Sequence, residues 1–232
     1  MIKSFSFLTR KPGMTHDQFV RHWHDVHVPM SHEVPGLRGY IVSTVVDQQT
    51  RADVPGFEMA PFDGLAQTWF DDLEGRARAG ASPEGKRWHA DGATIIGNIR
   101  MFVTKEDVVV PLPAQRPPLK TLSLIKRRPE LSAAQFNHHW RDIHAPMARD
   151  VPKLRGFALS GIVEEQFRPD IQPFTMDGPL DGFAESWWDS RESRTEMVAS
   201  DKGKAWFADG AKFIGAVRSM LLSERVVIAP PA

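Results

Sequence analysis

The strongest constraint on the fold is that the chain contains the same sequence twice. Three pairs of segments correspond without gaps, at a nearly constant spacing: 19–47 with 136–164, 63–71 with 181–189, and 85–100 with 203–218. A repeat that spans most of a chain predicts two copies of one structural unit. We therefore expect two modules, residues 1–112 and residues 113–232, with the proline-rich stretch VPLPAQRPPLK as the connector between them.

Both copies predict the same order of secondary structure. The first copy begins with an alternating segment at 3–10 that is typical of a strand, and a capping box at Thr15–Gln18 then starts a helix. We expect this helix to end before Pro29, because proline disfavours helical continuation. The following segments predict two strands, a second helical region and a last strand, at 37–46, 65–70, 72–90 and 94–105.

This order, β-α-β-β-α-β, is that of the ferredoxin-like fold. One such sheet has a face covered by helices and a bare face. Two modules in one chain can cover each other's bare faces. The predicted fold class is therefore α+β, with two tandem ferredoxin-like modules packed back to back as a fused pseudo-dimeric α+β barrel.

Two motifs of the repeat are specific enough to suggest a family. A strand ending in Arg-Lys-Pro precedes F-x-x-x-W-x-x-x-H-x-P and V-P-x-L-R-x-Y, and the second half departs from this pattern where Phe157 replaces Tyr40. With these motifs the chain resembles the EthD-like family of the dimeric α+β barrel superfamily. The resemblance implies a small, mostly apolar cavity between sheet and helices. Related barrels include cofactor-free polyketide cyclases, muconolactone isomerases, anthrone-type oxygenases and polyketide decarboxylases.

His27, His144 and Tyr40 are the candidate catalytic residues. Each histidine precedes a proline at the expected end of the first helix, so its ring could point into a cavity and exchange protons near neutral pH. The same position also suits a histidine that only stabilises a helix C-terminus. Tyr40 is the single tyrosine of the chain, and its hydroxyl could donate a hydrogen bond to a developing enolate or phenolate oxygen.

Aromatic and basic side chains complete the predicted sites. Tryptophan rings suit flat ligands, and arginine can hold a carboxylate, although a structural salt bridge is an equal alternative for the arginines. Six of the nine histidines lie in the first half, which we expect to be the active half if only one cavity works. The predicted substrate-binding residues are His22, Trp23, Arg38, Trp88, His89, Trp140 and Arg155.

Composition and motifs exclude several classes of protein. The chain has no cysteine, and its 29 basic and 29 acidic residues give no bulk attraction to nucleic acid or to an anionic membrane. No apolar run could span a bilayer and no signal peptide is visible, so we expect a cytoplasmic protein. The second copy lacks His24, the only helical partner of His27 for a metal, and no nucleotide-binding loop is present, so we predict neither metal nor cofactor.

We interpret the chain as a cofactor-free acid–base enzyme for a small aromatic or polyketide-like carboxylate or phenol. Among reaction types we favour a lyase of the decarboxylase type, in which histidine transfers a proton while arginine or tyrosine holds an oxygen. Cyclisation and lactone isomerisation need the same groups and stay open. A cofactor-free oxygenase of phenols or anthrones and a non-catalytic accessory binding protein are further alternatives. A homodimer of the fused chain is also compatible with the sequence.

Overall fold

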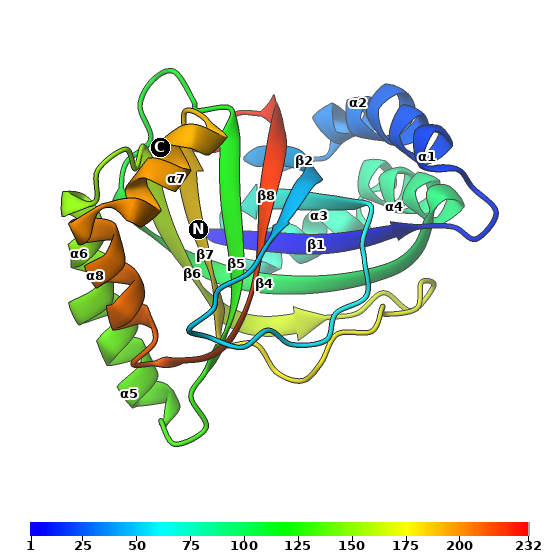
Figure 1. The fold of residues 1–232 in the computed structure, drawn as a ribbon. Coiled ribbons are helices and arrows are strands. Elements are labelled where there is room, and N and C mark those ends of the chain that lie inside the picture. Colours follow the sequence, from blue (N-terminus) through cyan, green and yellow to red (C-terminus); the bar gives the residue numbers. More distant parts are fainter. Residues whose placement is uncertain (232) are drawn as a thin grey trace.

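Eight antiparallel strands close into one barrel in the computed structural model of this chain, which describes residues 1–231 (Figure 1). Around the barrel the strands follow the order β1-β3-β2-β8-β5-β7-β6-β4. Their bounds are β1 (Ile2–Arg10), β2 (Gly39–Gln49), β3 (Gly64–Phe70), β4 (Ile96–Val110), β5 (Leu119–Arg127), β6 (Gly156–Gln166), β7 (Gly182–Trp188) and β8 (Ile214–Ile228).

Each half of the chain supplies four neighbouring strands in the ferredoxin-like order, β4-β1-β3-β2 and β8-β5-β7-β6. The halves meet along two seams, where β4 pairs with β6 and β2 pairs with β8. The predicted α+β barrel with ferredoxin-like strand order is therefore confirmed. Neither half forms a closed barrel alone, because each seam joins a strand of one half to a strand of the other.

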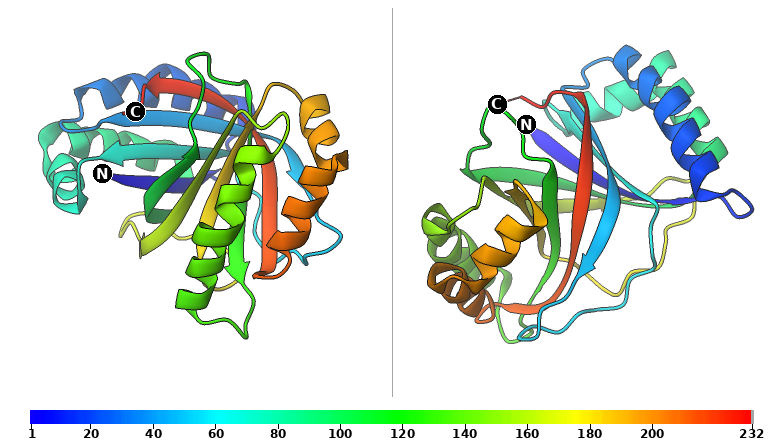
Figure 2. Two further views of the ribbon diagram at one scale, coloured as in Figure 1. Left: turned by 90° about the vertical axis from the view of Figure 1, so that its left-hand side faces the viewer. Right: turned by 45° about the horizontal axis from the view of Figure 1, so that its top comes forward.

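The helices lie outside the barrel in two groups on different sides (Figures 1 and 2). The predicted capping box at Thr15 is present, Ser132 forms the corresponding one in the second half, and Ser82 caps the helix that begins at Pro83. None of the helices in residues 1–231 is long and apolar enough to cross a membrane. The helices are α1 (His16–His22), α2 (Val28–Met30), α3 (Leu73–Ala81), α4 (Pro83–Ile95), α5 (Ala133–His138), α6 (Ala145–Met147), α7 (Arg191–Ala199) and α8 (Asp201–Gly210).

The prediction that the first helix ends before Pro29 is wrong. After α1 the chain widens into a π-helical turn, η1 (Trp23–His27), and then continues through Pro29 into α2 and a 3-10 turn, η2 (Ser31–Glu33). The N–H of Val28 donates to the carbonyl of Trp23, five residues back. Proline has no N–H and its ring crowds the preceding turn, so a wider turn accommodates it.

The second copy has the same arrangement around Pro146, where η3 (His139–His144) leads into α6 and η4 (Ala148–Asp150). His27 and His144 consequently lie within a continuous helical segment and not at its end. The wider turn also changes which side chains share a face. Trp23 is buried, but Val26, which 3–4 spacing would place on the same face of a regular α-helix, is 44% exposed.

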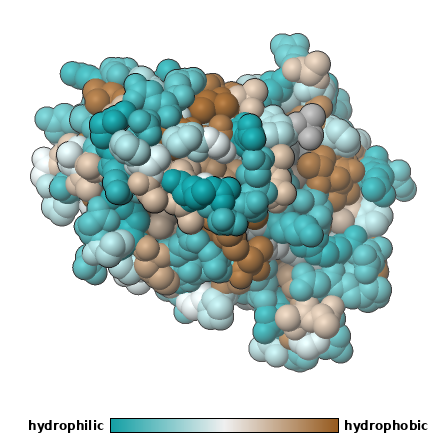
Figure 3. Space-filling view, turned by 180° about the vertical axis from the view of Figure 1, so that it is seen from behind, coloured by the Kyte–Doolittle hydropathy of each residue, from teal (hydrophilic) through white to brown (hydrophobic). Residues whose placement is uncertain are grey.

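One end of the barrel interior is apolar. Inward-facing side chains from both halves, such as Phe7 and Phe183, pack there against two loops, 50–63 and 167–181. These loops also pair with each other, because Met59 forms a β-bridge with Met176. The two halves are thus connected through their loops as well as along the seams. On the outside, the face seen in Figure 3 is mainly hydrophilic, with hydrophobic residues in separate patches.

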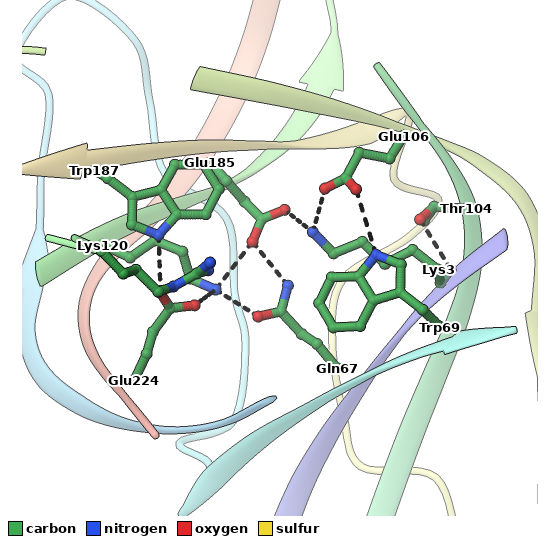
Figure 4. Close-up of polar contacts among 10 residues, drawn as sticks. Lys3, Gln67, Trp69, Thr104, Glu106, Lys120, Glu185, Trp187 and Glu224 are labelled. Carbon is green, nitrogen blue, oxygen red and sulfur yellow. Dashed lines mark hydrogen bonds and ion pairs between the residues drawn. The ribbon is translucent and has the colours of Figure 1, made fainter. Parts of the chain in front are cut away.

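The other end of the interior contains buried charges (Figure 4). Lys3 and Lys120 share Glu185: the Nζ of Lys120 lies 2.9 Å from Oε1 of Glu185, and the Nζ of Lys3 contacts the other oxygen. Gln67 occupies the corresponding position of the first half and donates a hydrogen bond of 2.7 Å to Glu185. A glutamine opposite a glutamate avoids two carboxylates facing each other at the centre of the barrel.

Each buried lysine has a second carboxylate of its own. Glu106 lies 2.6 Å from Lys3, and Glu224 lies 2.6 Å from Lys120. Arg116 also pairs with Glu224. Three cations therefore balance three carboxylates in this cluster, and such pairing is what makes buried charge tolerable.

Candidate functional site

A cavity of about 100 Å³ lies in the first half, between the outer face of the sheet and the helices. Ser6 and Ala66 line it from the sheet, while Trp23, His27 and Trp88 line it from the helices. A single buried water needs about 10–15 Å³, so this cavity has room for several waters or one small organic molecule. Its position agrees with the cavity that the sequence predicts.

Asp91 on α4 fixes the orientation of the His27 ring. The Nδ1 atom of His27 lies 2.8 Å from Oδ2 of Asp91, and the ring stacks on Trp88 with 5.2 Å between centroids. Burial lowers the pKa of His27 below its ordinary value, although the Asp91 carboxylate acts in the opposite direction. A neutral ring that donates Nδ1–H to Asp91 keeps a lone pair on Nε2. No side chain or backbone group among residues 1–231 bonds Nε2, so it is available to accept a proton.

A glycine follows Asp91, and another follows Asp209, the corresponding aspartate of the second half. Each glycine lies where its helix approaches a histidine ring. A Cβ atom at Gly92 would lie 3.1 Å from Cε1 of His27, and one at Gly210 would lie 3.5 Å from Cε1 of His144. At Gly92 a Cβ would therefore crowd the imidazole of His27, whereas the distance at Gly210 is that of an ordinary contact. The sequence contains a signal for this site, because Ala-Asp-Gly occurs in both halves, at 90–92 and 208–210.

His22 does not line the cavity, contrary to its predicted role in substrate binding. Its Nε2 atom lies 2.9 Å from Oδ1 of Asp91, the oxygen that His27 leaves free. His139 makes the corresponding contact with Asp209 in the second half, at 3.2 Å. His22 and His139 therefore contact the aspartates but do not line the cavities. Any effect of these two histidines on a ligand would be transmitted through the aspartates.

Tyr40 lies on β2, is fully buried and lines the cavity, as predicted. Its ring meets Trp88 edge-on, with 5.5 Å between centroids. Burial raises the pKa of Tyr40 well above its ordinary value. The hydroxyl therefore stays protonated near neutral pH, so it can donate a hydrogen bond but cannot serve as a base.

Arg38 and Arg155, the predicted carboxylate ligands, do not reach the cavities. Arg38 pairs with Asp71 at 2.8 Å and Arg155 pairs with Asp189 at 2.8 Å. Both arginines lie on the exposed surface, just before the strands that follow the first helix of each half. The prediction was wrong because nearness to a strand in sequence does not decide which side of the sheet a flanking side chain occupies.

Two other arginines line the first cavity, Arg76 of α3 and Arg168. Arg76 donates to the side-chain oxygen of Gln166, and no carboxylate of residues 1–231 lies within ion-pair distance of it. Burial lowers the pKa of Arg76, but an arginine in a protein keeps its charge. Glu164 acts on this charge without contacting it, so the cavity contains a cation that no carboxylate of the described residues pairs with directly.

Arg168 comes from the opposite half of the chain. The loop after β6 carries it to the first cavity, where it donates to the carbonyl of His89 at 2.9 Å. The loop after β2 likewise carries Arg51 to the second half, where it donates to the carbonyl of Phe207 at 2.7 Å. Each arginine also pairs with an aspartate two residues later. Each cavity is thus bordered by an arginine of the other half.

The remaining predicted residues all line one of the two cavities. Trp23, Trp88 and His89 line the first cavity, and His89 lies exposed at its rim. Trp140 lines the second cavity. No group of three or more histidine, aspartate or glutamate side chains in the described part of the chain could hold a metal ion.

The second cavity, of about 80 Å³, occupies the corresponding place in the second half. The Nδ1 atom of His144 lies 3.0 Å from Oδ2 of Asp209, and the ring stacks on Trp206 with 5.4 Å between centroids. Burial lowers the pKa of His144 to about 4, against the opposing effect of Asp209. His27 and His144 therefore make the same two contacts: Nδ1 bonds an aspartate carboxylate, and the ring stacks on a tryptophan.

We expect the His144 ring to titrate at an unusually low pH. A ¹⁵N NMR titration of histidine-labelled protein should give a midpoint near pH 4 for this ring, because burial disfavours the imidazolium form. The Nδ1–H should remain bonded to Asp209 throughout the neutral range. A midpoint at or above the ordinary value of 6.5 would contradict this assignment.

The family model that matches this chain is the EthD domain, over residues 11–98 and 128–216. The chain belongs to the EthD domain family. Both matched segments carry the histidine–aspartate pair described above. The resemblance inferred from the repeated motifs is therefore confirmed.

One relative of this chain has a stated activity. A 4-carboxymethyl-4-methylbutenolide mutase from Pseudomonas reinekei is 33% identical over 106 residues, which are 46% of this chain and 98% of that protein. Nearly the whole relative thus corresponds to less than half of this chain.

Two solved structures have the same fold along the entire chain. An anthrone oxidase-like protein superposes with a TM-score of 0.64 at 11% identity, covering 100% of this chain and 95% of that one. A candidate monooxygenase from Lactobacillus acidophilus gives 0.62 at 10% identity, covering 99% and 96%. At such low identities these similarities describe the fold alone.

Proposed function

We propose that this EthD-family protein is a cofactor-independent isomerase that moves a proton within a small carboxylate. The observation that carries the proposal is the first cavity itself, where the unbonded Nε2 of His27 and the uncompensated cation of Arg76 line the same small space. Arg76 would hold the carboxylate of the substrate. His27 would remove a proton from a carbon next to a carbonyl group and return it at another position of the same molecule.

The reaction balances without a further reactant. One C–H bond breaks, the proton resides on Nε2 of His27, and a new C–H bond forms on the same carbon skeleton. The enolate oxygen that develops between these steps would accept a hydrogen bond from the Tyr40 hydroxyl, which remains protonated. Asp91 would stabilise the imidazolium form of His27 without taking its proton.

Isomerisation is better supported than the decarboxylation that the sequence favoured. The relative is named as a mutase of a carboxymethyl-substituted butenolide, a lactone that also bears a carboxylate. An arginine that binds the carboxylate also stabilises it in the ground state, and this opposes loss of carbon dioxide. The favoured substrates are therefore unsaturated lactones or conjugated rings that carry a carboxylate. The aromatic or phenolic substrate predicted from the sequence stays a prediction, and so does the homodimer.

We also propose that the chain arose by tandem duplication of a module the length of this relative, with modules at residues 1–112 and 113–232. The repeated motifs, the two matches to the family model and the equal strand order of the two halves support this origin.

The function is tested by incubating the protein with carboxymethyl-butenolides in D₂O and recording ¹H NMR spectra. The expected result is an isomer of the substrate with the same carbon skeleton that carries deuterium at the position to which the proton has moved. Release of carbon dioxide would instead support the decarboxylase. A requirement for dissolved oxygen would support the oxygenase, and absence of turnover with binding intact would support an accessory protein.

We expect Arg76→Leu to raise KM about 10- to 100-fold while changing kcat little, since a hydrogen bond to a charged group contributes about 1.5–3 kcal/mol. The matched control is Arg38→Leu, which removes an exposed arginine paired with Asp71. Steady-state kinetics of both variants measure the difference. A rise of KM in Arg38→Leu but not in Arg76→Leu would show that Arg38, as the sequence predicts, and not Arg76 binds the substrate.

A further inference from the structure

The second cavity repeats the histidine–aspartate pair and the helix arginine of the first but has a different wall. We propose that it is a separate binding site for small aromatic carboxylates that carry no second polar substituent, whereas the first cavity takes oxygenated carboxylates. The role of arginine as carboxylate ligand rests on the proposed function. The second site and its ligand class go beyond it.

Arg194 is the anion ligand of this second site. It lies on α7 at the position that Arg76 occupies on α3, and it lines the second cavity. Its guanidinium makes no hydrogen bond or ion pair with any group of residues 1–231. Asp47, whose charge acts on Arg194, is itself paired with Arg191 at 3.1 Å. A partly buried guanidinium without a protein anion favours a carboxylate ligand, which it can bind in a bidentate manner.

Two hydrogen-bonding groups of the first cavity have apolar counterparts in the second, while Ser219 stands where the first cavity has Met101. Phe157 replaces Tyr40, and Phe207 replaces His89 at the rim. In the first cavity the hydroxyl of Tyr40 is a donor, and the ring nitrogens of His89 bond no group in the described residues. The phenylalanines offer neither a donor nor an acceptor, so a polar substituent of a ligand would lose its hydrogen bonds with water beside them.

The same wall is also shaped for a flat ring. Trp206 stacks on His144 and meets Phe157 edge-on, with 5.0 Å between centroids. Trp188 and Met197 are larger than the residues at the corresponding positions of the first cavity, and the cavity volume falls from about 100 to about 80 Å³. Two sheet hydroxyls, those of Ser123 and Ser219, bond each other at 2.8 Å. A flat apolar ring therefore matches this cavity better than an oxygenated one.

The energetic consequence is a sorting of ligands between the two cavities. Burying a hydroxyl without a partner costs about 1–3 kcal/mol, which corresponds to roughly a 5- to 150-fold loss of affinity. A hydroxyl-bearing carboxylate should therefore prefer the first cavity, where Tyr40 and His89 can bond it. An unsubstituted aryl carboxylate has no such need and should prefer the more apolar second cavity.

The test uses benzoate and the three monohydroxybenzoates as probes in titration calorimetry of the full-length protein. We expect Arg194→Leu to weaken benzoate binding at least about 10-fold and Arg76→Leu to leave it nearly unchanged. For the hydroxybenzoate that binds best, we expect the opposite result: Arg76→Leu should weaken its binding, and Arg194→Leu should leave its binding nearly unchanged. Circular dichroism and melting temperature establish that each variant is folded.

Two further measurements keep the proposal falsifiable if a variant does not fold. In wild-type protein, benzoate should shift the ring ¹⁵N signals of His144, which lines the second cavity, more than those of His27. The double substitution Phe157→Tyr with Phe207→His should transfer the hydroxybenzoate preference to the second cavity. Benzoate binding that depends on Arg76 and not on Arg194, or no measurable benzoate binding at all, overturns the inference.

These outcomes are separate from the proposed function. If benzoate binds through Arg194 while no butenolide is isomerised, the proposed isomerase activity fails and the second site stands. If butenolides are isomerised and benzoate binds only through Arg76, the function stands and the second site fails.

Discussion

Replacing His27 by alanine is expected to lower kcat for isomerisation about 10²- to 10⁴-fold, the usual contribution of a positioned general base. The ring supplies the Nε2 lone pair at the cavity, and the hydroxyl of Tyr40 cannot replace it because its pKa is raised by burial. KM should change little, since Arg76 still holds the carboxylate. Kinetics followed by NMR with a carboxymethyl-butenolide provide the measurement.

His32→Ala is the matched control, because this histidine lies in η2 of the same helical segment and its side chain is exposed. Asp91→Asn separates positioning from chemistry. The Asp91 carboxylate raises the pKa of His27 against the effect of burial, so its loss should move the acidic limb of the kcat/KM profile to lower pH. If His27→Ala retains activity within about threefold of wild type, His27 is not the base and its contact with Asp91 is structural.

Replacing Glu185 by glutamine is expected to lower the free energy of unfolding by about 3–5 kcal/mol, the usual cost of breaking a buried ion pair by removing one partner. The change leaves Lys3 and Lys120 without the carboxylate that they share at the centre of the barrel. Urea denaturation measures the loss. The control is Asp177→Asn, which breaks an exposed pair with Lys126 and should cost no more than about 1 kcal/mol.

The same carboxylate predicts a dependence of stability on pH. Burial alone would raise the pKa of Glu185, but Lys3 and Lys120 outweigh it and lower the pKa to about 2. A carboxyl group whose pKa is lower in the folded chain adds stability above its unfolded pKa, here near 4.5, and this stability is lost as the pH falls toward 2. Glu185→Gln should therefore show a shallower loss of stability across this range. An unchanged slope would mean that other carboxyl groups dominate acid unfolding.

Local sequence signals were sufficient for most of the fold. Alternation in the strands, the capping boxes at Thr15 and Ser132, and Pro83 at a helix start act within a few residues, so they are readable without the structure. Pro29 was misread because the local rule for proline was overridden by packing. Trp23 and His27 are both buried in the π-helical turn, and this tertiary contact supports a geometry that an isolated helix would avoid.

The candidate site was only partly predictable. His27, Tyr40 and Trp88 were found because they lie in or near the repeated motifs. Arg76 recurs in the second half as Arg194, but its segment is too variable for the repeat to draw attention to it. Arg168 lies in a loop of the other half, and a sequence read module by module does not indicate that the loops cross the seams.

The crossing of the loops has a consequence for how the two halves can diverge. Arg168 lies in the second half of the chain but borders the cavity of the first, and Arg51 lies in the first half but borders the cavity of the second. A substitution in either loop therefore changes the surroundings of a ligand bound by the other half. Neither half of the chain can therefore change its loop without affecting the cavity of the other half.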